Sequence, residues 1–224
     1  MMGTMPRGKD TMMKSGNNGY EYMNKAVLFD LDGVLVDACD WHYEALNRAL
    51  KQVANYEISR EDHNSNYNGL PTKRKLKRLS ELGVIRESDM EDISDLKQRL
   101  TVEVIEEFCI HSLSKVVLMK MLKKAGYKVG CVTNSIRHTA GLMLEKIGVM
   151  DYLDVVITNE QCNYNKPHPE PYIKALVKLN SLPQDSIIVE DSPKGLQAAR
   201  LTGCRVLEVK NATEVTKELF KDKI

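Results

Sequence analysis

The chain has 224 residues, which is enough for one substantial domain or for a core domain that carries a smaller inserted domain. Its 32 lysine and arginine residues nearly cancel its 31 aspartate and glutamate residues, so the formal net charge is only +1. No overall field attracts nucleic acid or an anionic membrane, and no apolar run reaches the length of a membrane span. We therefore expect neither a nucleic acid nor a membrane as a partner.

The cysteine content and the first residues bear on where the protein works. The five cysteines are odd in number, scattered, and free of any C-x-x-C pair: Cys39, Cys109, Cys131, Cys162 and Cys204. This pattern is typical of reduced thiols in the cytoplasm, where we place the protein, rather than of a disulfide framework or a zinc site. Residues 1–22 lack the continuous apolar segment of a signal peptide, and we expect them to form a disordered extension.

The folded pattern begins with a strand that ends in two aspartates. Residues 26–29 are apolar without a break, as expected of a strand that is buried on both faces of a parallel sheet. Asp30 and Asp32 follow two residues apart, so an extended backbone would point both carboxylates the same way, and Gly33 allows a sharp turn. Two ionised carboxylates need a cation beside them, and Mg²⁺ suits their oxygen atoms. The alternative is a polar loop that merely closes the strand.

Residues 38–111 show helical periodicity and no strand signal. Ser59 has the position of a helix N-cap, and residues 64–72 form a turn-rich break. We interpret the basic run at 73–78 as the solvated face of an amphipathic helix, although it could instead draw an anionic substrate toward a cleft. The predicted helices cover residues 40–53, 72–82 and 96–108.

After residue 112, predicted strands alternate with predicted helices. This alternation implies right-handed crossovers and a parallel sheet that is covered on both faces. We therefore predict a two-part α/β core domain, residues 23–37 and 112–224, with an all-helical domain inserted at 38–111. The strands are expected at 128–132, 153–158, 186–189 and 205–209, and the helices at 116–124, 137–147, 169–179, 193–202 and after 213.

Polar residues follow most of the predicted strands. The carboxyl ends of parallel strands meet at one edge of the sheet, where sites in such sheets form. An acid pair, a hydroxyl, a lysine and a second acid pair at that edge suit the handling of a phosphoryl group. One carboxylate can attack phosphorus, another can transfer protons, and Mg²⁺ with lysine can neutralise charge. The residues that we expect to converge are Asp30, Asp32, Thr133, Asn134, Lys166, Glu190 and Asp191.

Four motifs occur in the order DxDGVLxD, TNS, KPxPEPY and VEDSxxG. This order resembles the haloacid dehalogenase-like hydrolases of subfamily I, in the branch that contains beta-phosphoglucomutase and small sugar or phosphoglycolate phosphatases. The resemblance covers Met23 to Val209. It implies a Rossmann-like parallel sheet core with an α-helical cap domain inserted after the first motif.

The resemblance also implies a role for each core residue. Asp30 would be the nucleophile, and Asp32 would be the general acid and base. Thr133 and Asn134 would donate hydrogen bonds to the phosphoryl oxygens, and Lys166 would pair with the phosphoryl group and the nucleophile.

The implied cofactor is Mg²⁺. It would be bound by Asp30, by the backbone carbonyl of Asp32 and by Asp191, while Glu190 would support the metal shell.

Two residues of the predicted insert enter the substrate prediction. His42 lies ten residues after Asp32, where the mutase branch carries a cap histidine that assists closure, but a half-buried helical histidine is an equally simple explanation. Gly69 lies in the cap loop that would contact the substrate.

The favoured function is a Mg²⁺-dependent phosphatase that hydrolyses a small phosphorylated metabolite, a sugar phosphate or a phosphoglycolate-like compound, through an aspartyl-phosphate, and acts as a monomer. A phosphomutase is the alternative within the family, but the mutases carry a basic pair in the cap loop, whereas residues 68–72 contain no cation before Lys73. A non-catalytic phosphate-binding regulatory domain is an alternative of another class, and it would be favoured if a core residue were missing. None is missing. The basic run alone motivates a third alternative, a phosphatase of nucleic-acid ends.

Overall fold

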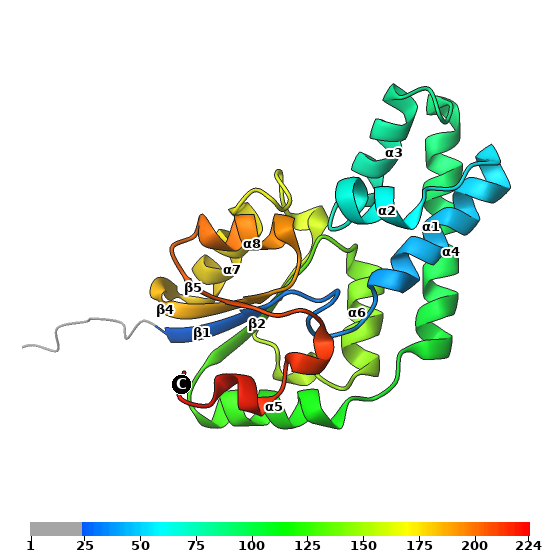
Figure 1. Ribbon diagram of the computed structural model, residues 1–224. Coiled ribbons are helices and arrows are strands. Elements are labelled where there is room, and N and C mark those ends of the chain that lie inside the picture. Colours follow the sequence, from blue (N-terminus) through cyan, green and yellow to red (C-terminus); the bar gives the residue numbers. More distant parts are fainter. Residues whose placement is uncertain (1–23) are drawn as a thin grey trace, which may run out of the picture.

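The computed structural model describes residues 24–224, so the expected N-terminal extension lies outside the described residues. Within them, five parallel strands form one sheet in the order β3-β2-β1-β4-β5, with β1 at its centre (Figure 1). The predicted α/β fold with a parallel sheet is confirmed. The strands are β1 (Asn24–Phe29), β2 (Lys128–Val132), β3 (Val155–Ile157), β4 (Ser181–Glu190) and β5 (Arg205–Glu208).

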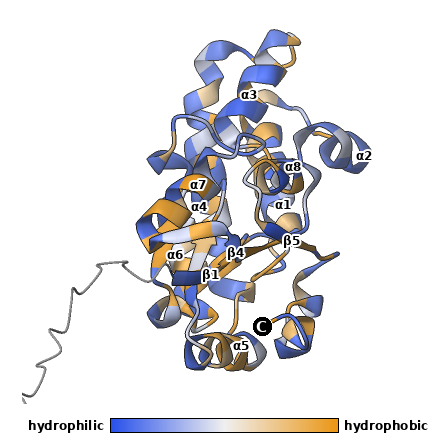
Figure 2. Cartoon of the chain, turned by 90° about the vertical axis from the view of Figure 1, so that its left-hand side faces the viewer, coloured by the Kyte–Doolittle hydropathy of each residue, from blue (hydrophilic) through white to orange (hydrophobic). Residues whose placement is uncertain are grey.

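Strand β1 is buried on both faces, which explains its unbroken apolar sequence. Val27 and Phe29 pack against helices α5 and α6, whereas Ala26 and Leu28 pack against α7 and α8. Figure 2 shows apolar colouring gathered on the sheet and on helix α7. The covering helices are α5 (Leu113–Lys124), α6 (Arg137–Lys146), α7 (Glu170–Leu179) and α8 (Pro193–Arg200).

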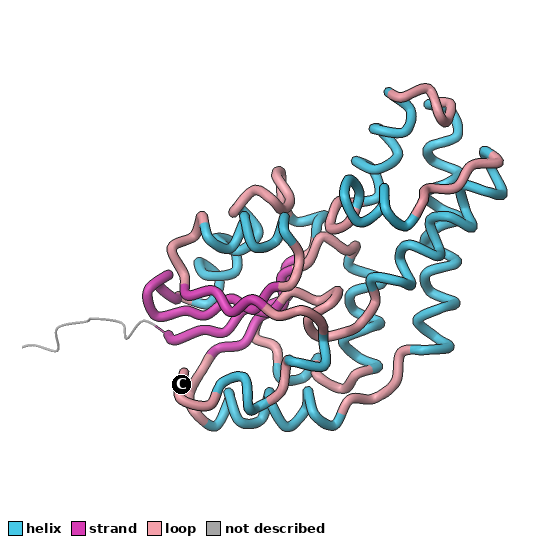
Figure 3. The backbone as a smooth tube through the Cα atoms, viewed as in Figure 1, coloured by secondary structure: helices cyan, strands magenta, loops and turns pink. Residues whose placement is uncertain are grey.

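The helical insert, residues 38–111, contains only helices and loops and projects from the edge of the α/β layers (Figures 1 and 3). It has an apolar cluster of its own, in which Leu46 and Leu50 pack with Leu76, Leu79 and Ile93. No helix in the described part of the chain is both long enough and apolar enough to cross a membrane. The α-helices of the insert are α1 (Cys39–Ala54), α2 (Arg60–Asp62), α3 (Thr72–Glu81) and α4 (Met90–Phe108).

The break predicted at 64–72 is more regular than its sequence suggests. The Ser59 hydroxyl accepts a hydrogen bond from the backbone N–H of Asp62, as predicted for an N-cap. The chain then continues from α2 into a π-helix, His63–Tyr67, before it turns toward α3. Tyr67 is buried in the core of the insert, so tertiary packing supports a helical turn whose asparagine-rich sequence favours loops.

The α-helix predicted after residue 213 is wrong. The chain forms two short 3₁₀ segments there, Ala212–Glu214 and Lys217–Phe220. Lys115 of α5 is buried, and its ammonium donates hydrogen bonds to the backbone carbonyls of Ala212 and Val215. These carbonyls are therefore not used in an α-helical ladder, and Phe220 packs edge-on against Phe29 beneath the sheet.

Lys115→Met is expected to lower the free energy of unfolding by about 2 kcal/mol, because two buried carbonyls lose charge-assisted hydrogen bonds. Lys120→Met changes an exposed lysine of the same helix and should stay within about 0.5 kcal/mol of the parent. Urea unfolding of the three proteins measures both effects. Equal stability of the two variants would mean that apolar packing alone holds the C-terminal segment.

Candidate active site

The ends of three strands meet at the predicted edge of the sheet. Asp30 directly follows β1, Thr133 directly follows β2, and Glu190 ends β4. A cleft of about 620 Å³ lies between this edge and the helical insert, and Asp30, Asp32 and Lys166 line it. A cleft of this size suits a small ligand.

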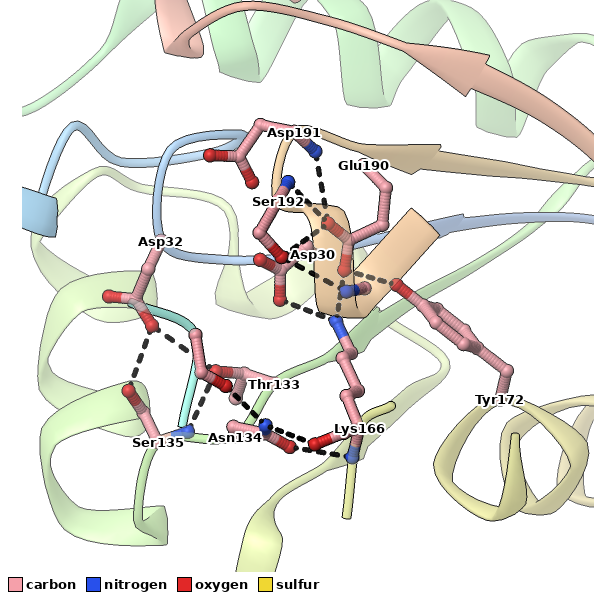
Figure 4. Close-up of polar contacts among 12 residues, drawn as sticks. Asp30, Asp32, Thr133, Asn134, Ser135, Lys166, Tyr172, Glu190, Asp191 and Ser192 are labelled. Carbon is pink, nitrogen blue, oxygen red and sulfur yellow. Dashed lines mark hydrogen bonds and ion pairs between the residues drawn. The ribbon is translucent and has the colours of Figure 1, made fainter. Parts of the chain in front are cut away.

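A buried lysine joins two carboxylates at the centre of the site (Figure 4). Lys166 Nζ lies 2.8 Å from Asp30 Oδ1 and 2.5 Å from Glu190 Oε1. Burial alone lowers the pKa of Lys166, but the charges of Asp30 and Glu190 outweigh it and raise that pKa above its usual value. The lysine therefore carries a positive charge against the proposed nucleophile.

Glu190 is fully buried, and both of its oxygens accept hydrogen bonds. Oε1 accepts from Lys166 and from the Tyr172 hydroxyl at 2.8 Å. Oε2 accepts from the backbone N–H groups of Asp191 and Ser192, at 2.9 and 3.1 Å. These donors fix Glu190 behind Asp30, where it orients the surrounding groups.

The acidic cluster fits a divalent cation. Carboxylate oxygens of Asp30, Glu190 and Asp191 lie within 4.8 Å of one another. Asp191 Oδ1 is buried and accepts no hydrogen bond from any of the described residues. The backbone approaches this carboxylate at Gly33, where a Cβ would lie 2.1 Å from Asp191 Oδ2 and where φ is +89°.

The charges of the cluster lead to the same conclusion. Three carboxylates face the single positive charge of Lys166. Burial, and next the charge of Glu190, raise the pKa of Asp191 to about 7, and the same two causes raise the pKa of Asp30. A cation would relieve this repulsion, and hard carboxylate oxygens are the ligands that Mg²⁺ prefers. The side chain of Asp32 is not part of this cluster.

Asp32 points instead toward the helical insert. Its Oδ2 accepts hydrogen bonds from Ser135 Oγ at 2.8 Å and from Thr133 Oγ1 at 3.3 Å, and its Oδ1 lies 2.8 Å from His42 Nε2. Burial raises the pKa of Asp32, but His42, the Ser135 hydrogen bond and Lys97 together outweigh it and lower that pKa to about 2. Asp32 is therefore ionised in this arrangement.

The contacts of His42 define its protonation. Lys97 Nζ lies 3.2 Å from His42 Nδ1 and can only donate, so Nδ1 is the acceptor and Nε2 carries the hydrogen that is donated to Asp32. Burial and the charge of Lys97 both lower the pKa of His42, as expected of a neutral ring. The half-buried histidine suggested by the sequence thus connects the helical insert to Asp32.

Asn134 lies in the site, but its side chain is occupied by backbone groups. Its Nδ2 donates to the carbonyls of Gly69 and Lys166, at 2.8 and 3.2 Å, and its Oδ1 accepts from the Lys166 N–H. Lys194 Nζ donates to the Asn68 carbonyl at 2.7 Å. These contacts hold the loop of the insert against the core, and Gly69, with φ +72°, supplies its left-handed turn.

Sequence reasoning missed several residues that line or support the site. Ser135 belongs to the TNS motif and could have been named with it. Tyr172, which supports Glu190, is the last residue of the KPxPEPY motif and could likewise have been named with it. Lys75 and Lys97 lie in charged stretches that resemble a solvated helix face, yet both are buried and line the cleft. The interpretation of the basic run at 73–78 as solvated is therefore wrong for Lys75.

The chain is similar to several known proteins. A family model described as haloacid dehalogenase-like hydrolase matches residues 27–209. A phosphorylated carbohydrates phosphatase of Thermotoga maritima is 28% identical over 80% of this chain and 82% of that protein. A phosphoglycolate phosphatase of Nitrosospira multiformis is 29% identical over 81% of each chain. The crystal structure of beta-phosphoglucomutase from Clostridium difficile superposes with a TM-score of 0.77 at 25% identity, covering 90% of this chain and 97% of that one.

Two glycine substitutions test how tightly Glu190 is held. In Gly195→Ala the added Cβ would lie 1.8 Å from Glu190 Oε1, so the carboxylate must leave Lys166. We expect a loss of about 3 kcal/mol in unfolding free energy, because overpacking adds to the disrupted ion pair. Gly141→Ala, in α6, meets nothing within 4 Å and should stabilise the helix by up to about 1 kcal/mol.

Urea unfolding curves of both alanine variants and the parent measure these opposite effects. A Gly195→Ala protein as stable as the parent would show that Glu190 can move without cost.

Proposed function

The chain belongs to the haloacid dehalogenase-like hydrolase family, and on this premise we propose that it is a Mg²⁺-dependent phosphatase of small phosphorylated metabolites. The observation that carries the proposal is the buried carboxylate of Asp30, which is paired with Lys166. Beside it lies an oxygen of Asp191 that has no hydrogen-bond partner in the described part of the chain. Asp32 faces the same cleft from the side of the helical insert. The site therefore offers a nucleophile and a separate group for proton transfer.

In the first step, an oxygen of Asp30 forms a bond to phosphorus while the bond from phosphorus to the leaving oxygen breaks. As the anionic ester binds beside it, Asp32 takes up a proton from solvent, and it delivers this proton to the leaving oxygen. In the unliganded cleft the low pKa of Asp32 favours its ionised form. The negative charge of a bound phosphate acts in the opposite direction, raising that pKa and favouring the protonated form.

In the second step, Asp32 takes a proton from water as the water oxygen attacks the aspartyl-phosphate. Free phosphate leaves and Asp30 is regenerated. The hydrogen bond from His42 holds the Asp32 carboxylate in place.

The remaining site residues bind and orient. Lys166 neutralises charge on Asp30 and on the phosphoryl oxygens. The Thr133 hydroxyl, which donates to Asp32 in the structure and lines the cleft, would turn to donate to the same oxygens. Asn134 positions the Lys166 loop and the Gly69 loop, a role that its contacts favour over the direct phosphoryl contact expected from sequence.

Asp30, Asp191 and the backbone carbonyl of Asp32 would hold Mg²⁺, with Glu190 behind them. When bound, the ion supplies positive charge against the developing charge of the phosphoryl group.

We assign the helical insert as a cap domain over residues 38–111. His42 and Gly69 bring it to the cleft, and closure over the strand ends excludes bulk water from the reacting groups. The names of the relatives, a phosphatase of phosphorylated carbohydrates and a phosphatase of phosphoglycolate, support the small-metabolite class. The cytoplasmic location and the monomeric state stay predictions from the sequence.

A phosphomutase is the second candidate, because the superposed crystal structure is a beta-phosphoglucomutase that is covered almost completely. The loop at 68–72 still lacks the basic pair of the mutases. Product analysis separates the two: free phosphate is expected from a phosphatase, whereas β-glucose 1-phosphate with a bisphosphate primer would give glucose 6-phosphate in a mutase.

Asp30→Asn should reduce phosphate release by at least about 1,000-fold, because the amide is a poor nucleophile and loses the charge that pairs with Lys166. Asp37→Asn changes an exposed aspartate of the same segment and should keep parental activity. The assay measures phosphate release from a panel of sugar phosphates and phosphoglycolate, with circular dichroism to check the fold. Parental turnover by Asp30→Asn would refute the mechanism.

Mg²⁺ should raise the melting temperature of the parent protein, because a ligand that binds only the folded state stabilises it by about 2.7 kcal/mol at one hundred times its Kd. Asp191→Asn should lose most of this gain, whereas Asp185→Asn, at an exposed position of β4, should keep it. Thermal unfolding with and without Mg²⁺ measures the difference. An unchanged gain in Asp191→Asn would remove that residue from the metal site.

A further inference from the structure

Two buried lysines of the helical insert face the cleft without a carboxylate partner. Lys75 of α3 is 7% exposed and Lys97 of α4 is 6% exposed, and both line the cleft that contains Asp30. Among residues 24–224, no ion pair or hydrogen bond reaches Lys75 Nζ. Within the same residues, the one polar contact of Lys97 Nζ is with the neutral ring of His42.

The other buried lysines of the protein show how unusual this is. Lys166 pairs with two carboxylates, and Lys115 donates to two backbone carbonyls. The Lys75 ammonium is not among the fully enclosed atoms without partners in the described residues, so it reaches the cleft. With only 7% of the residue exposed it keeps little hydration, and such a cation is costly without a counter-charge. Burial, followed by the charge of Lys97, lowers the pKa of Lys75 to about 7, and burial lowers the pKa of Lys97 to about 8. Such a pair is expected where a ligand brings the missing negative charge.

The position of the pair indicates which part of a substrate it meets. After burial, the groups that act most strongly on Lys75 are Lys97, Asp32 and Lys194, and the carboxylates around the metal position are not among them. Lys97 lies behind His42, which contacts Asp32. Because Asp32 is the proposed proton donor to the leaving oxygen, the two lysines lie on the leaving-group side of the cleft.

The same wall of the cleft has further polar atoms without protein partners. His63 Nδ1 and Gln98 Oε1 are buried and have no hydrogen-bond partner among the described residues, and both side chains line the cleft. As an N–H donor, His63 Nδ1 could meet an anion, whereas Gln98 Oε1 only accepts and would need a hydroxyl of the ligand. The formal charges on this side also leave a surplus, since Lys75 and Lys97 face the single carboxylate of Asp32. The wall is therefore suited to a polar, anionic group.

We infer that Lys75, supported by Lys97, forms a second anion site, so that the preferred substrate is a small phosphate ester whose leaving group carries its own carboxylate or phosphoryl group. This inference rests on the proposed phosphatase function, which assigns the two sides of the cleft. The loop at 68–72 has no cation, and Lys75 supplies one about a turn later, in helix α3.

Kinetics on matched esters test the site. Phosphoglycolate and the bisphosphate of ethylene glycol carry a second anionic group on the leaving group. The leaving group of 2-hydroxyethyl phosphate is uncharged, and this ester is called the neutral one below. Lys75→Met should lower kcat/KM by about 30-fold on the preferred anionic ester, mainly through KM, and stay within about threefold on the neutral one. Lys77→Met removes an exposed lysine of the same helix and should behave as the parent.

The kcat/KM values on phosphoglycolate and on the bisphosphate of ethylene glycol show whether the site prefers a carboxylate or a phosphoryl group. Equal losses by Lys75→Met on charged and neutral esters, or an unchanged preference for charged esters, would overturn the inference.

A binding experiment separates this inference from the proposed function. In the presence of Mg²⁺, calorimetry compares 3-phosphonopropionate with 3-hydroxypropylphosphonate, which has an uncharged hydroxyl in place of the carboxylate. Neither compound can be hydrolysed. The parent and Lys77→Met should prefer the carboxylate by about tenfold or more, and Lys75→Met should lose that preference. If no ester is turned over but this preference depends on Lys75, the phosphatase proposal fails and the anion site stands. If esters are hydrolysed without any such preference, the anion site fails.

Thermal unfolding guards against a folding defect. Lys75→Met removes an unpaired buried charge, so its melting temperature should rise by about 2 °C or more, while Lys77→Met should leave it unchanged. A lower melting temperature of Lys75→Met would contradict the assignment of Lys75 as an uncompensated cation.

Discussion

The double ion pair of Lys166 is the interaction on which the rest of the site depends. Its ammonium joins Asp30, at the end of β1, to Glu190, at the end of β4, and its own backbone is fixed by Asn134 beyond β2. Loss of the lysine would leave two buried carboxylates without a counter-charge, which is far more costly than the loss of an exposed pair. The charge that organises the strand ends is thus the same charge that the proposed chemistry uses.

Charge is divided unequally across the cleft, and this division connects the fold to the proposed function. The core side carries the surplus of negative charge at Asp30, Glu190 and Asp191, which suits a cation. The side of the helical insert carries the surplus of positive charge at Lys75 and Lys97, which suits an anion. A phosphate ester with a second anionic group would complement both sides, and its binding would favour closure of the insert over the site.

Much of this arrangement could be predicted from the sequence, because parallel strands bring their carboxyl ends together wherever they lie in the chain. The apolar run at 26–29 and the motifs that follow β1, β2 and β4 were enough to bring Asp30, Thr133 and Asp191 to one edge. The two buried lysines of the helical insert could not be found in this way. Lys75 sits in a basic run whose other lysines and arginines are exposed, and only the packing of α3 against the cleft distinguishes it. The prediction of an α-helix after residue 213 was wrong for a similar reason, because Lys115, which is distant in the sequence, donates to the backbone carbonyls of that segment.

The central claim is that Asp30 accepts a phosphoryl group, and ¹⁹F NMR with beryllofluoride tests it most directly. Beryllofluoride mimics a phosphoryl group on a nucleophilic carboxylate and needs no knowledge of the natural substrate. The account predicts bound fluoride resonances that require Mg²⁺, that vanish in Asp30→Asn and that persist in Asp37→Asn. Bound resonances that survive in Asp30→Asn, or none in the Mg²⁺-loaded parent, would contradict it.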